Sequence, residues 1–463
     1  MNAKQLKEEL FYNKKNSVKI LSDDLIKKAD SYCEPYKEFL GISKTEREFC
    51  KNSMKIAEEN GFVPFSKNSN YKPGDKVYLV NRDKNIVLAV IGKRPIEEGM
   101  KLAVAHIDSP RLDLKPNPLY EDSELAFLKT HYYGGIKKYQ WTAIPLSLHG
   151  VVIKSNGEKV EINIGEDEGD PVFCVNDLLP HLSEAQMKRP AKDIIYGEDL
   201  NIIVGSRPFK DDDESELVKL NIMNILNKKY GIVERDFISA ELEIVPAFNP
   251  SDVGLDRSMI GAYGQDDKVC AYNSLRAIID CKDVDYTVVT MLADKEEVGS
   301  DGNTGMNSCF FEYFIEDLAN TFGANGRTVF SNSECMSADV GAAFDPNYAD
   351  VHERRNSAMC GFGTIITKYT GSRGKASTSD ASAEFVDKIT RILDKNNIVW
   401  QTGELGKIDG GGGGTVAMFL AKLNMDVVDV GVPILSMHSP FEISSKIDVF
   451  ENYRAILAFF EQK

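Results

Sequence analysis

The second half of the chain alternates between apolar, strand-like runs and amphipathic, helix-like segments. Beyond Pro250, Cys270–Asp280 has helical periodicity, and Tyr286–Leu292 is a continuous run of β-branched and apolar residues. Further along, Ala381–Lys395 is expected to form an amphipathic helix and Val427–Val432 a buried strand. Continuously apolar strands are typical of sheets that are covered on both faces, and helices that alternate with strands provide that cover. The pattern predicts an α/β fold in which a mixed sheet is flanked by helices.

The segment 112–245 interrupts this pattern. Short β-rich pieces, such as Leu146–Lys154 and Phe237–Val245, are separated by polar loops there. The acidic run Asp211–Glu214 within the segment is expected to be a solvated loop. The simplest organisation is one α/β domain built from residues 1–111 plus 246–463, with a β-rich domain inserted at 112–245.

Composition excludes several kinds of partner and compartment. A formal net charge of -16 argues against binding to nucleic acid or to an anionic membrane. The 8 cysteines contain no CxxC pair, so neither a disulfide framework nor a thiolate zinc site is expected. The charged N-terminal stretch lacks the apolar core of a signal peptide, and no run approaches about 18 apolar residues. We therefore expect a cytoplasmic protein without membrane spans.

Polar residues that could carry chemistry stand where apolar runs stop, which is the edge at which open α/β sheets bind ligands. His106 and Asp108 close one apolar strand, and side chains two residues apart point the same way. Asp108 can therefore orient the His106 ring, as carboxylates commonly do for metal-bound imidazoles. Glu296 and Glu297 follow the apolar run Tyr286–Leu292. One glutamate could bind a metal while the other keeps an oxygen free to accept a proton.

Three further segments complete the set. Asp266 and Asp267 precede a helix, where either could simply cap the helix N-terminus. Asp339 interrupts small and apolar neighbours, and His438 follows a buried strand. Each residue alone also fits a structural role in a cap, a loop or a packed core. Together, two histidines and three carboxylates with a spare glutamate match a dinuclear site with one bridging carboxylate, and such ligands suit Zn²⁺, Co²⁺ or Mn²⁺.

In this order, these segments resemble the aspartyl aminopeptidase family of dinuclear metallopeptidases, which includes vacuolar aminopeptidase I. The resemblance covers nearly the whole chain. Its most specific stretches are AHIDSPRLDLKP at 105–116, YGG at 133–135, DKEEVGS at 294–300, SADVGAAFDPNY at 337–348 and SMHSPFE at 436–442.

The resemblance implies that two divalent ions, most readily Zn²⁺, are held by His106, Asp266, Glu297, Asp339 and His438. Asp266 would bridge the ions, with His106 and Asp339 completing one site and Glu297 and His438 the other. Asp266 is preferred to its neighbour because the family's bridging aspartate is followed directly by Asn or Asp.

The resemblance also implies roles outside the ligand set. Glu296 becomes the general base, and Asp108 becomes the partner of His106. His181 matches a family histidine that approaches the active site of a neighbouring subunit, so it is expected to contact substrate or, less readily, a metal. The alternative is an ordinary surface histidine. The inserted segment 112–245 would be the family's β-rich assembly domain, and the expected assembly is a tetrahedral dodecamer.

The expected function is therefore a two-metal-ion aminopeptidase that removes acidic or neutral N-terminal residues from peptides. Arg373 and Lys375 could pair with an acidic substrate side chain. The backbone at Gly411 could approach the peptide closely, although such a glycine run is also typical of a mobile linker. The stretch Asp409–Thr415 resembles the glutamyl/deblocking aminopeptidases. A deblocking enzyme or an amidase is therefore one alternative, and a non-catalytic assembly protein that retains the fold is another.

Overall fold

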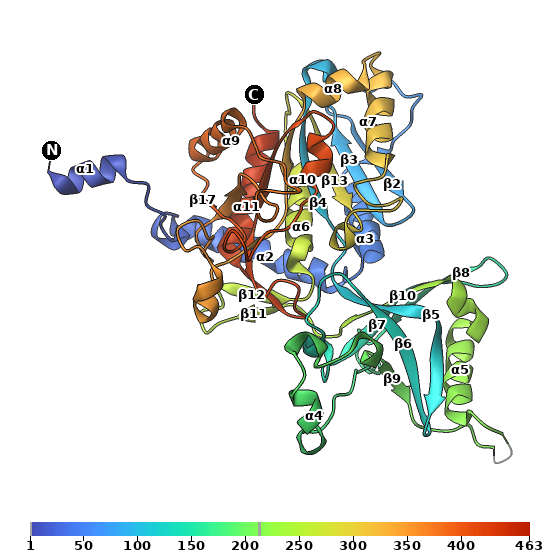
Figure 1. Ribbon diagram of the computed structural model, residues 1–463. Coiled ribbons are helices and arrows are strands. Elements are labelled where there is room, and N and C mark those ends of the chain that lie inside the picture. The colour runs from blue at the N-terminus through green and yellow to red at the C-terminus, as the bar shows by residue number, and fades with distance from the viewer. Residues whose placement is uncertain (1, 212–213) are drawn as a thin grey trace.

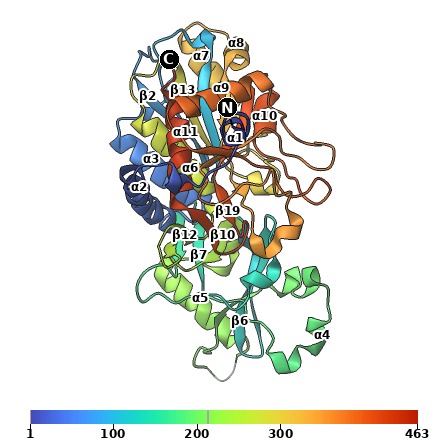
Figure 2. The ribbon, with the colours of Figure 1, turned by 90° about the vertical axis from the view of Figure 1, so that its left-hand side faces the viewer.

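Three sheets organise the protein in the computed structural model, which describes residues 2–211 and 214–463. Asp212 and Asp213 of the acidic run lie outside the described residues. Figure 1 shows a larger α/β body and, below it, a second body built around an antiparallel sheet. The view turned by 90° in Figure 2 shows the same division.

The largest sheet has 9 strands in the order β1-β2-β3-β13-β4-β14-β18-β16-β17. Its centre is parallel, because β4 pairs in parallel with both β13 and β14, and β14 pairs in parallel with β18. Antiparallel pairs of β13 with β3 and of β18 with β16 flank this centre, so the sheet is mixed, as predicted. The strands are β1 (Val63–Pro64), β2 (Lys76–Asn81), β3 (Asn85–Val90), β4 (Met100–His106), β13 (Thr287–Ala293), β14 (Glu334–Ser337), β16 (Thr364–Thr367), β17 (Trp400–Thr402) and β18 (Asp426–Gly431).

Helices cover both faces of this sheet, which explains why β4 and β13 are buried along their whole length. Along β4, Ala103 and Ala105 pack on one face while Leu102 and Val104 pack on the other. The first face is covered by α2 (Asp23–Gly41), α3 (Glu46–Glu59), α6 (Gln265–Asp280), α9 (Ala383–Lys395) and α11 (Lys446–Phe460). The second face is covered by α7 (Phe310–Thr321), α8 (Gly326–Asn332) and α10 (Ala417–Ala421).

Helix α9 illustrates how the sequence specifies such an element. The hydroxyl of Ser382 caps its N-terminus by accepting the backbone N–H of Phe385. Phe385, Ile389, Ile392 and Leu393 then form one apolar stripe that packs into the core. The short helix α1 (Ala3–Leu10) has no buried residue and extends away from the body. No described helix combines the length and the apolarity needed to cross a membrane.

The second sheet has 6 antiparallel strands in the order β8-β7-β10-β5-β6-β9, all drawn from residues 111–246. Helix α5 (Leu217–Tyr230) packs on it, and the two share a hydrophobic core of their own around Trp141 and Leu148. This sheet coincides closely with the segment 112–245, for which a β-rich insertion is expected. Its strands are β5 (Arg111–Asp122), β6 (Leu125–Tyr133), β7 (Leu146–Ile153), β8 (Lys159–Ile164), β9 (Ile202–Gly205) and β10 (Ala240–Pro246).

A third, small sheet lies beside the start of α6. Its order is β11-β12-β20-β19-β15, and its strand β12 runs directly into the loop before α6. The turn between β19 and β20 carries His438. The strands are β11 (Ser251–Val253), β12 (Met259–Ala262), β15 (Gly341–Ala342), β19 (Pro433–Leu435) and β20 (Glu442–Ser445).

Candidate metal centre

The residues singled out at strand ends converge at one edge of the central sheet. His106 is the last residue of β4, and Asp339 follows the adjacent parallel strand β14. Glu296 and Glu297 lie in a 3-10 turn (Glu296–Val298) just after β13, the other parallel neighbour of β4. Parallel strands end at the same edge, so these side chains meet there.

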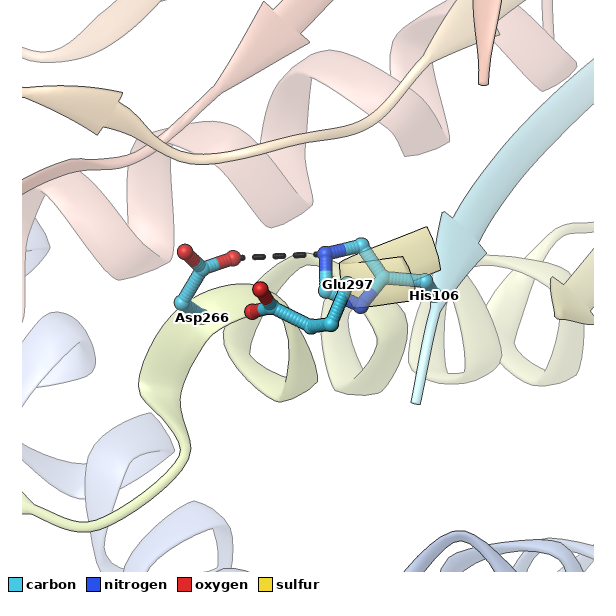
Figure 3. Close-up of side chains that lie close together, drawn as sticks. All are labelled: His106, Asp266 and Glu297. Atoms are coloured by element: carbon cyan, nitrogen blue, oxygen red, sulfur yellow. Dashed lines mark ion pairs between the residues drawn. The ribbon is translucent and has the colours of Figure 1, made fainter. Parts of the chain in front are cut away.

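Asp266, at the start of α6, lies between the two histidines. Its Oδ1 is 3.3 Å from Nε2 of His106, and its Oδ2 is 3.1 Å from Nε2 of His438. Glu297 Oε2 approaches the same His438 nitrogen at 3.4 Å. Figure 3 shows Asp266 reaching from the start of its helix toward His106 at the strand end, with Glu297 beside them.

Two groups of potential ligand atoms share His106. One contains Asp266 and Glu297, the other contains Asp267 and Asp339, and the atoms of each group lie within 4.8 Å of one another. The family resemblance favours Asp266 over Asp267 as the bridge, yet Asp267 Oδ2 also accepts the backbone N–H of His106 at 3.3 Å. The peptide bond between Asp266 and Asp267 is cis.

The charges at this site fit a cation. Among the described residues, the only basic side chains that form ion pairs with Asp266, Glu296, Glu297 and Asp339 are histidines. Glu297 Oε1 and Asp267 Oδ1 are buried and accept no hydrogen bond from the described part of the chain. Buried anionic oxygens are costly without a positive partner. A divalent cation would supply that partner, and nitrogen and oxygen donors without thiolates suit Zn²⁺.

The ionisation properties of these groups reflect the same crowding. Burial raises the pKa of Glu297 well above its usual range, and the negative charge of Asp266 adds to the effect. Burial and the charge of Asp267 do the same to the pKa of Asp339. Burial opposes protonation of His438, but its hydrogen bond to Asp266 and the charge of Glu297 prevail and raise its pKa to about 10. These carboxylates therefore repel one another and attract any available cation.

Asp108 orients His106 and also holds the glutamate turn. Its Oδ1 lies 3.3 Å from Nδ1 of His106, as the strand geometry predicted, and its backbone carbonyl lies 3.1 Å from the same nitrogen. The carboxylate also accepts the backbone N–H groups of Glu296 at 3.1 Å and Glu297 at 3.2 Å. Burial disfavours its charged form, but hydrogen bonds from His106 and Tyr133 lower the pKa of Asp108 to about 2.

Sequence reasoning missed the groups that position the ligands from outside. The buried carboxylate of Glu442 accepts the backbone N–H of Asp266 at 3.0 Å and that of His438 at 2.7 Å. Tyr133 donates its hydroxyl to Asp108 Oδ2 at 2.7 Å, and the Gly135 carbonyl oxygen lies 2.8 Å from His438 Nδ1. These residues lie inside the stretches YGG and SMHSPFE, and that position was the only sequence signal for them.

A cavity of about 630 Å³ opens beside this cluster. Arg373, Lys375 and Gly411 all line it, together with Glu296 and the proposed ligands Asp266, Glu297, Asp339 and His438. Lys375 Nζ is already paired with Asp380 at 2.8 Å. A Cβ at Gly411 would lie 1.8 Å from the Leu405 carbonyl oxygen, so the close packing of its own loop explains this glycine.

His181 lies elsewhere in this chain. It is exposed in a 3-10 turn (Pro180–Leu182) of the inserted segment and does not line the cavity. Helix α4 (Glu184–Met187), which follows directly, lies in the lower body in both ribbon views. A single chain therefore brings together the other candidate residues but not His181.

The mixed α/β fold and this cluster of imidazoles and carboxylates define the class as a metallopeptidase with a zinc aminopeptidase-like fold. A family model described as "Aminopeptidase I zinc metalloprotease (M18)" matches residues 39–460. The chain therefore belongs to the M18 family of aminopeptidases, as the sequence motifs indicated, and it is a hydrolase that acts on peptide bonds.

Three relatives illustrate the match. A "Probable M18 family aminopeptidase 1" of Clostridium acetobutylicum is 50% identical over 97% of this chain and 99% of its own length. The crystal structure of an M18 aminopeptidase from Thermotoga maritima has a TM-score of 0.94 at 44% identity, covering 98% of this chain and 100% of that one. The S. cerevisiae mApe1 dodecamer shares the fold, with a TM-score of 0.75 at 19% identity over 95% of this chain and 97% of its own.

Proposed function

We propose that this protein is a two-metal-ion aminopeptidase in which Asp266 bridges the ions. The observation that carries the proposal is the position of that carboxylate, with Oδ1 3.3 Å from the His106 nitrogen and Oδ2 3.1 Å from the His438 nitrogen. A bridging carboxylate must offer one oxygen to each ion. Asp339 would complete the His106 site, and Glu297 would complete the His438 site. Asp267 is the competing ligand of the His106 site, because its carboxylate lies near both His106 and Asp339.

Glu296 is the general base of the proposed reaction. When bound, the two ions would lower the pKa of an attacking water and polarise the scissile carbonyl. The Glu296 side chain is 20% exposed and faces the cavity, whereas the Glu297 side chain is 3% exposed and lies against His438. Burial, reinforced by the charge of Asp266, raises the pKa of Glu296 to about 6. Its carboxylate can therefore take a proton from water near neutral pH and return it to the leaving amine.

The cavity supports a preference for neutral, apolar N-terminal residues over acidic ones. Lys375 is the less suitable anchor for an acidic side chain, because Asp380 already neutralises it and its Nζ lies 3.7 Å from the centroid of the Tyr369 ring. Arg373 remains as the residue through which an acidic preference would act. Apolar side chains make up much of the rest of the wall: Val340, Ala342, Ala358, Ile365, Leu405, Ile408 and Met437.

The inserted segment 112–245 is proposed to serve assembly into a dodecamer. A protein of the same fold forms the dodecamer described above. Around His181, several large apolar side chains are exposed, namely Leu178, Leu179, Leu182 and Met187. Such a patch is typical of a surface that another subunit covers. His181 would then reach the cavity of a neighbouring subunit, in a cytoplasmic assembly.

Metal analysis combined with an amide panel tests the proposal. The purified full chain should hold two ions of Zn²⁺, Co²⁺ or Mn²⁺ and cleave free amino-acid amides while leaving N-acetylated ones intact. Cleavage of the acetylated amides would favour a deblocking enzyme or an amidase. Fewer than one ion per chain and no turnover after added metal would favour the non-catalytic alternative. Light scattering would test the dodecamer directly.

A further inference from the structure

The turn Tyr133-Gly134-Gly135, here called the YGG tip, connects the inserted sheet to the metal centre. It begins at the last residue of β6, the strand that pairs with β5, and β5 begins shortly after His106. The tip is hydrogen-bonded to groups that orient both histidines. The Tyr133 hydroxyl donates to Asp108, the partner of His106, and the Gly135 carbonyl accepts from His438 itself. The proposed function assigns nothing to it.

The Tyr133 hydroxyl holds one oxygen of the Asp108 carboxylate, which also contacts His106 and the Glu296 turn. It donates to Asp108 Oδ2 at 2.7 Å, while Oδ1 of the same carboxylate faces Nδ1 of His106 at 3.3 Å. The carboxylate also holds the backbone of the Glu296 turn at 3.1 Å. Without the hydroxyl, Asp108 would lose a donor that keeps its plane directed at His106. Partners of this kind set the orientation and the basicity of a metal-binding imidazole.

Gly135 acts on the second histidine directly. Its carbonyl oxygen lies 2.8 Å from His438 Nδ1, so that nitrogen is the one that carries the proton and donates it. The other ring nitrogen, Nε2, thereby faces Asp266 and Glu297, at 3.1 and 3.4 Å, and would offer its lone pair to an ion held between them. One backbone carbonyl therefore sets the direction of the ligand atom.

Two glycines are needed for the tip to come this close. Gly134 has a φ of +74°, and a Cβ there would lie 3.3 Å from Pro110 and 3.4 Å from the Cβ of Glu297. A Cβ at Gly135 would lie 3.3 Å from Nδ1 of His438. A side chain at Gly134 would crowd Pro110 in a backbone conformation that favours glycine, and a side chain at Gly135 would crowd the ring of His438.

Arg111 helps to hold the Tyr133 ring of the tip in place. The guanidinium of Arg111 lies 4.1 Å from the centroid of the Tyr133 ring. Arg111 is itself buried and pairs with Glu46 of α3 at 3.1 Å and with Glu243 of β10 at 3.3 Å. The Tyr133 ring thus packs against a guanidinium that is anchored to elements of both bodies, which limits the freedom of its hydroxyl to leave Asp108.

We propose that the YGG tip is the part of the inserted segment that positions both metal-binding histidines, with Tyr133 as a positioning residue. The inserted segment then contributes to metal binding within its own chain, separately from any role in assembly. This inference rests on the proposed function in that His106 and His438 are taken to be ligands.

The test compares Tyr133→Phe with Tyr132→Phe in the full-length protein. Tyr132 is the neighbour on the same strand, faces the other side and is 40% exposed. Chelator competition should show that Tyr133→Phe binds Zn²⁺ about tenfold or more weakly than wild type, while Tyr132→Phe does not. The visible absorption spectrum of the Co²⁺-loaded protein should change only in Tyr133→Phe. Equal affinities and equal spectra for the two variants would overturn the inference.

A second variant, at Gly135, tests the part of the inference that concerns His438. Gly135→Ala should weaken metal binding as well, whereas Gly41→Ala should not, because a Cβ at Gly41 makes only ordinary contacts at 3.5 Å. Light scattering should show the same assembly for all four variants; metal loss that occurs only together with dissociation would assign the tip to assembly and overturn its positioning role. If wild type binds no metal, the proposed function fails; if wild type binds metal and the tip variants bind it equally well, only this inference fails.

Discussion

Asp266 Oδ2 and His438 Nε2 lie 3.1 Å apart, although one residue lies in the first turn of α6 and the other in the turn after β19. Glu442 holds the two residues in this arrangement, because its buried carboxylate accepts the backbone N–H of both. The second oxygen of Asp266 faces His106 in the same way. A single carboxylate therefore links the end of the central sheet to the turn of the small third sheet that carries His438.

Replacing Glu296 by Gln should leave both metals bound but reduce kcat by about 10²–10⁴-fold, because the amide cannot accept a proton. Metal content by mass spectrometry and steady-state kinetics on an amino-acid amide check the two halves of this expectation. Glu59→Gln, exposed at the end of α3, is the matched control. Substantial residual turnover in the Glu296 variant would refute the general-base role.

The pair Asp266→Asn and Asp267→Asn separates the bridging ligand from its neighbour. Asp266→Asn should impair both sites and leave less than one ion per chain after dialysis, since each histidine loses its shared carboxylate partner. Asp267→Asn should retain two ions, because an amide oxygen can still accept the His106 N–H that Asp267 Oδ2 accepts at 3.3 Å. The reverse pattern of metal loss would make Asp267 the bridge.

Substrate preference should follow the apolar wall of the cavity. Leu- and Met-linked chromogenic amides should be cleaved with higher kcat/KM than Asp- and Glu-linked ones, and Arg373→Ala should preserve that order. Faster cleavage of the acidic substrates, lost in Arg373→Ala but retained in Lys375→Met, would instead assign an acidic preference to Arg373.

The pH dependence of stability should reveal a buried histidine between the two bodies. His149 of β7 lies 2.7 Å from Glu48 of α3 and 3.0 Å from Glu166. Burial opposes its protonation, but these two carboxylates prevail and raise its pKa to about 9. The folded pKa exceeds the unfolded value of about 6.5, so the charged ring stabilises the fold below pH 6.5. That contribution is lost as the pH rises toward 9.

Urea unfolding at a fixed protein concentration tests this expectation. Between pH 6.5 and 9, wild type should lose on the order of 2 kcal/mol that His149→Gln does not lose. The exposed His131 offers the matched control, and His131→Gln should behave like wild type. Parallel pH profiles for wild type and His149→Gln would show that His149 is not charged in the folded protein.

Much of the candidate site was predictable because each of its residues can be recognised from its immediate neighbours in the sequence. The apolar runs of β4 and β13 and the polar residues directly after them are visible in the sequence, and parallel neighbours must end at the same edge. His106 and Asp108 are likewise close because they lie two residues apart at the end of β4. The convergence of His106, Asp266 and His438 agrees with that expectation, while their roles as ligands stay a prediction.

The groups that could not be predicted act across long separations. Nothing near Glu442 shows that its two oxygens cap the backbone of Asp266 and His438, and nothing near Tyr133 shows that its hydroxyl meets Asp108. The pairing of Lys375 with Asp380 is also a matter of loop conformation. His181 lies away from the cavity in this chain, and its role stays a prediction.

By itself, then, the sequence determined which strands are buried, where each of them stops and which ionisable residues stand there, because hydrophobic periodicity and residue chemistry are local properties. Only the tertiary structure decided which of those residues meet and what holds them. Hydrogen bonds such as those of Tyr133 and Glu442 join segments that are distant along the chain, and they form only when the sheets pack against one another.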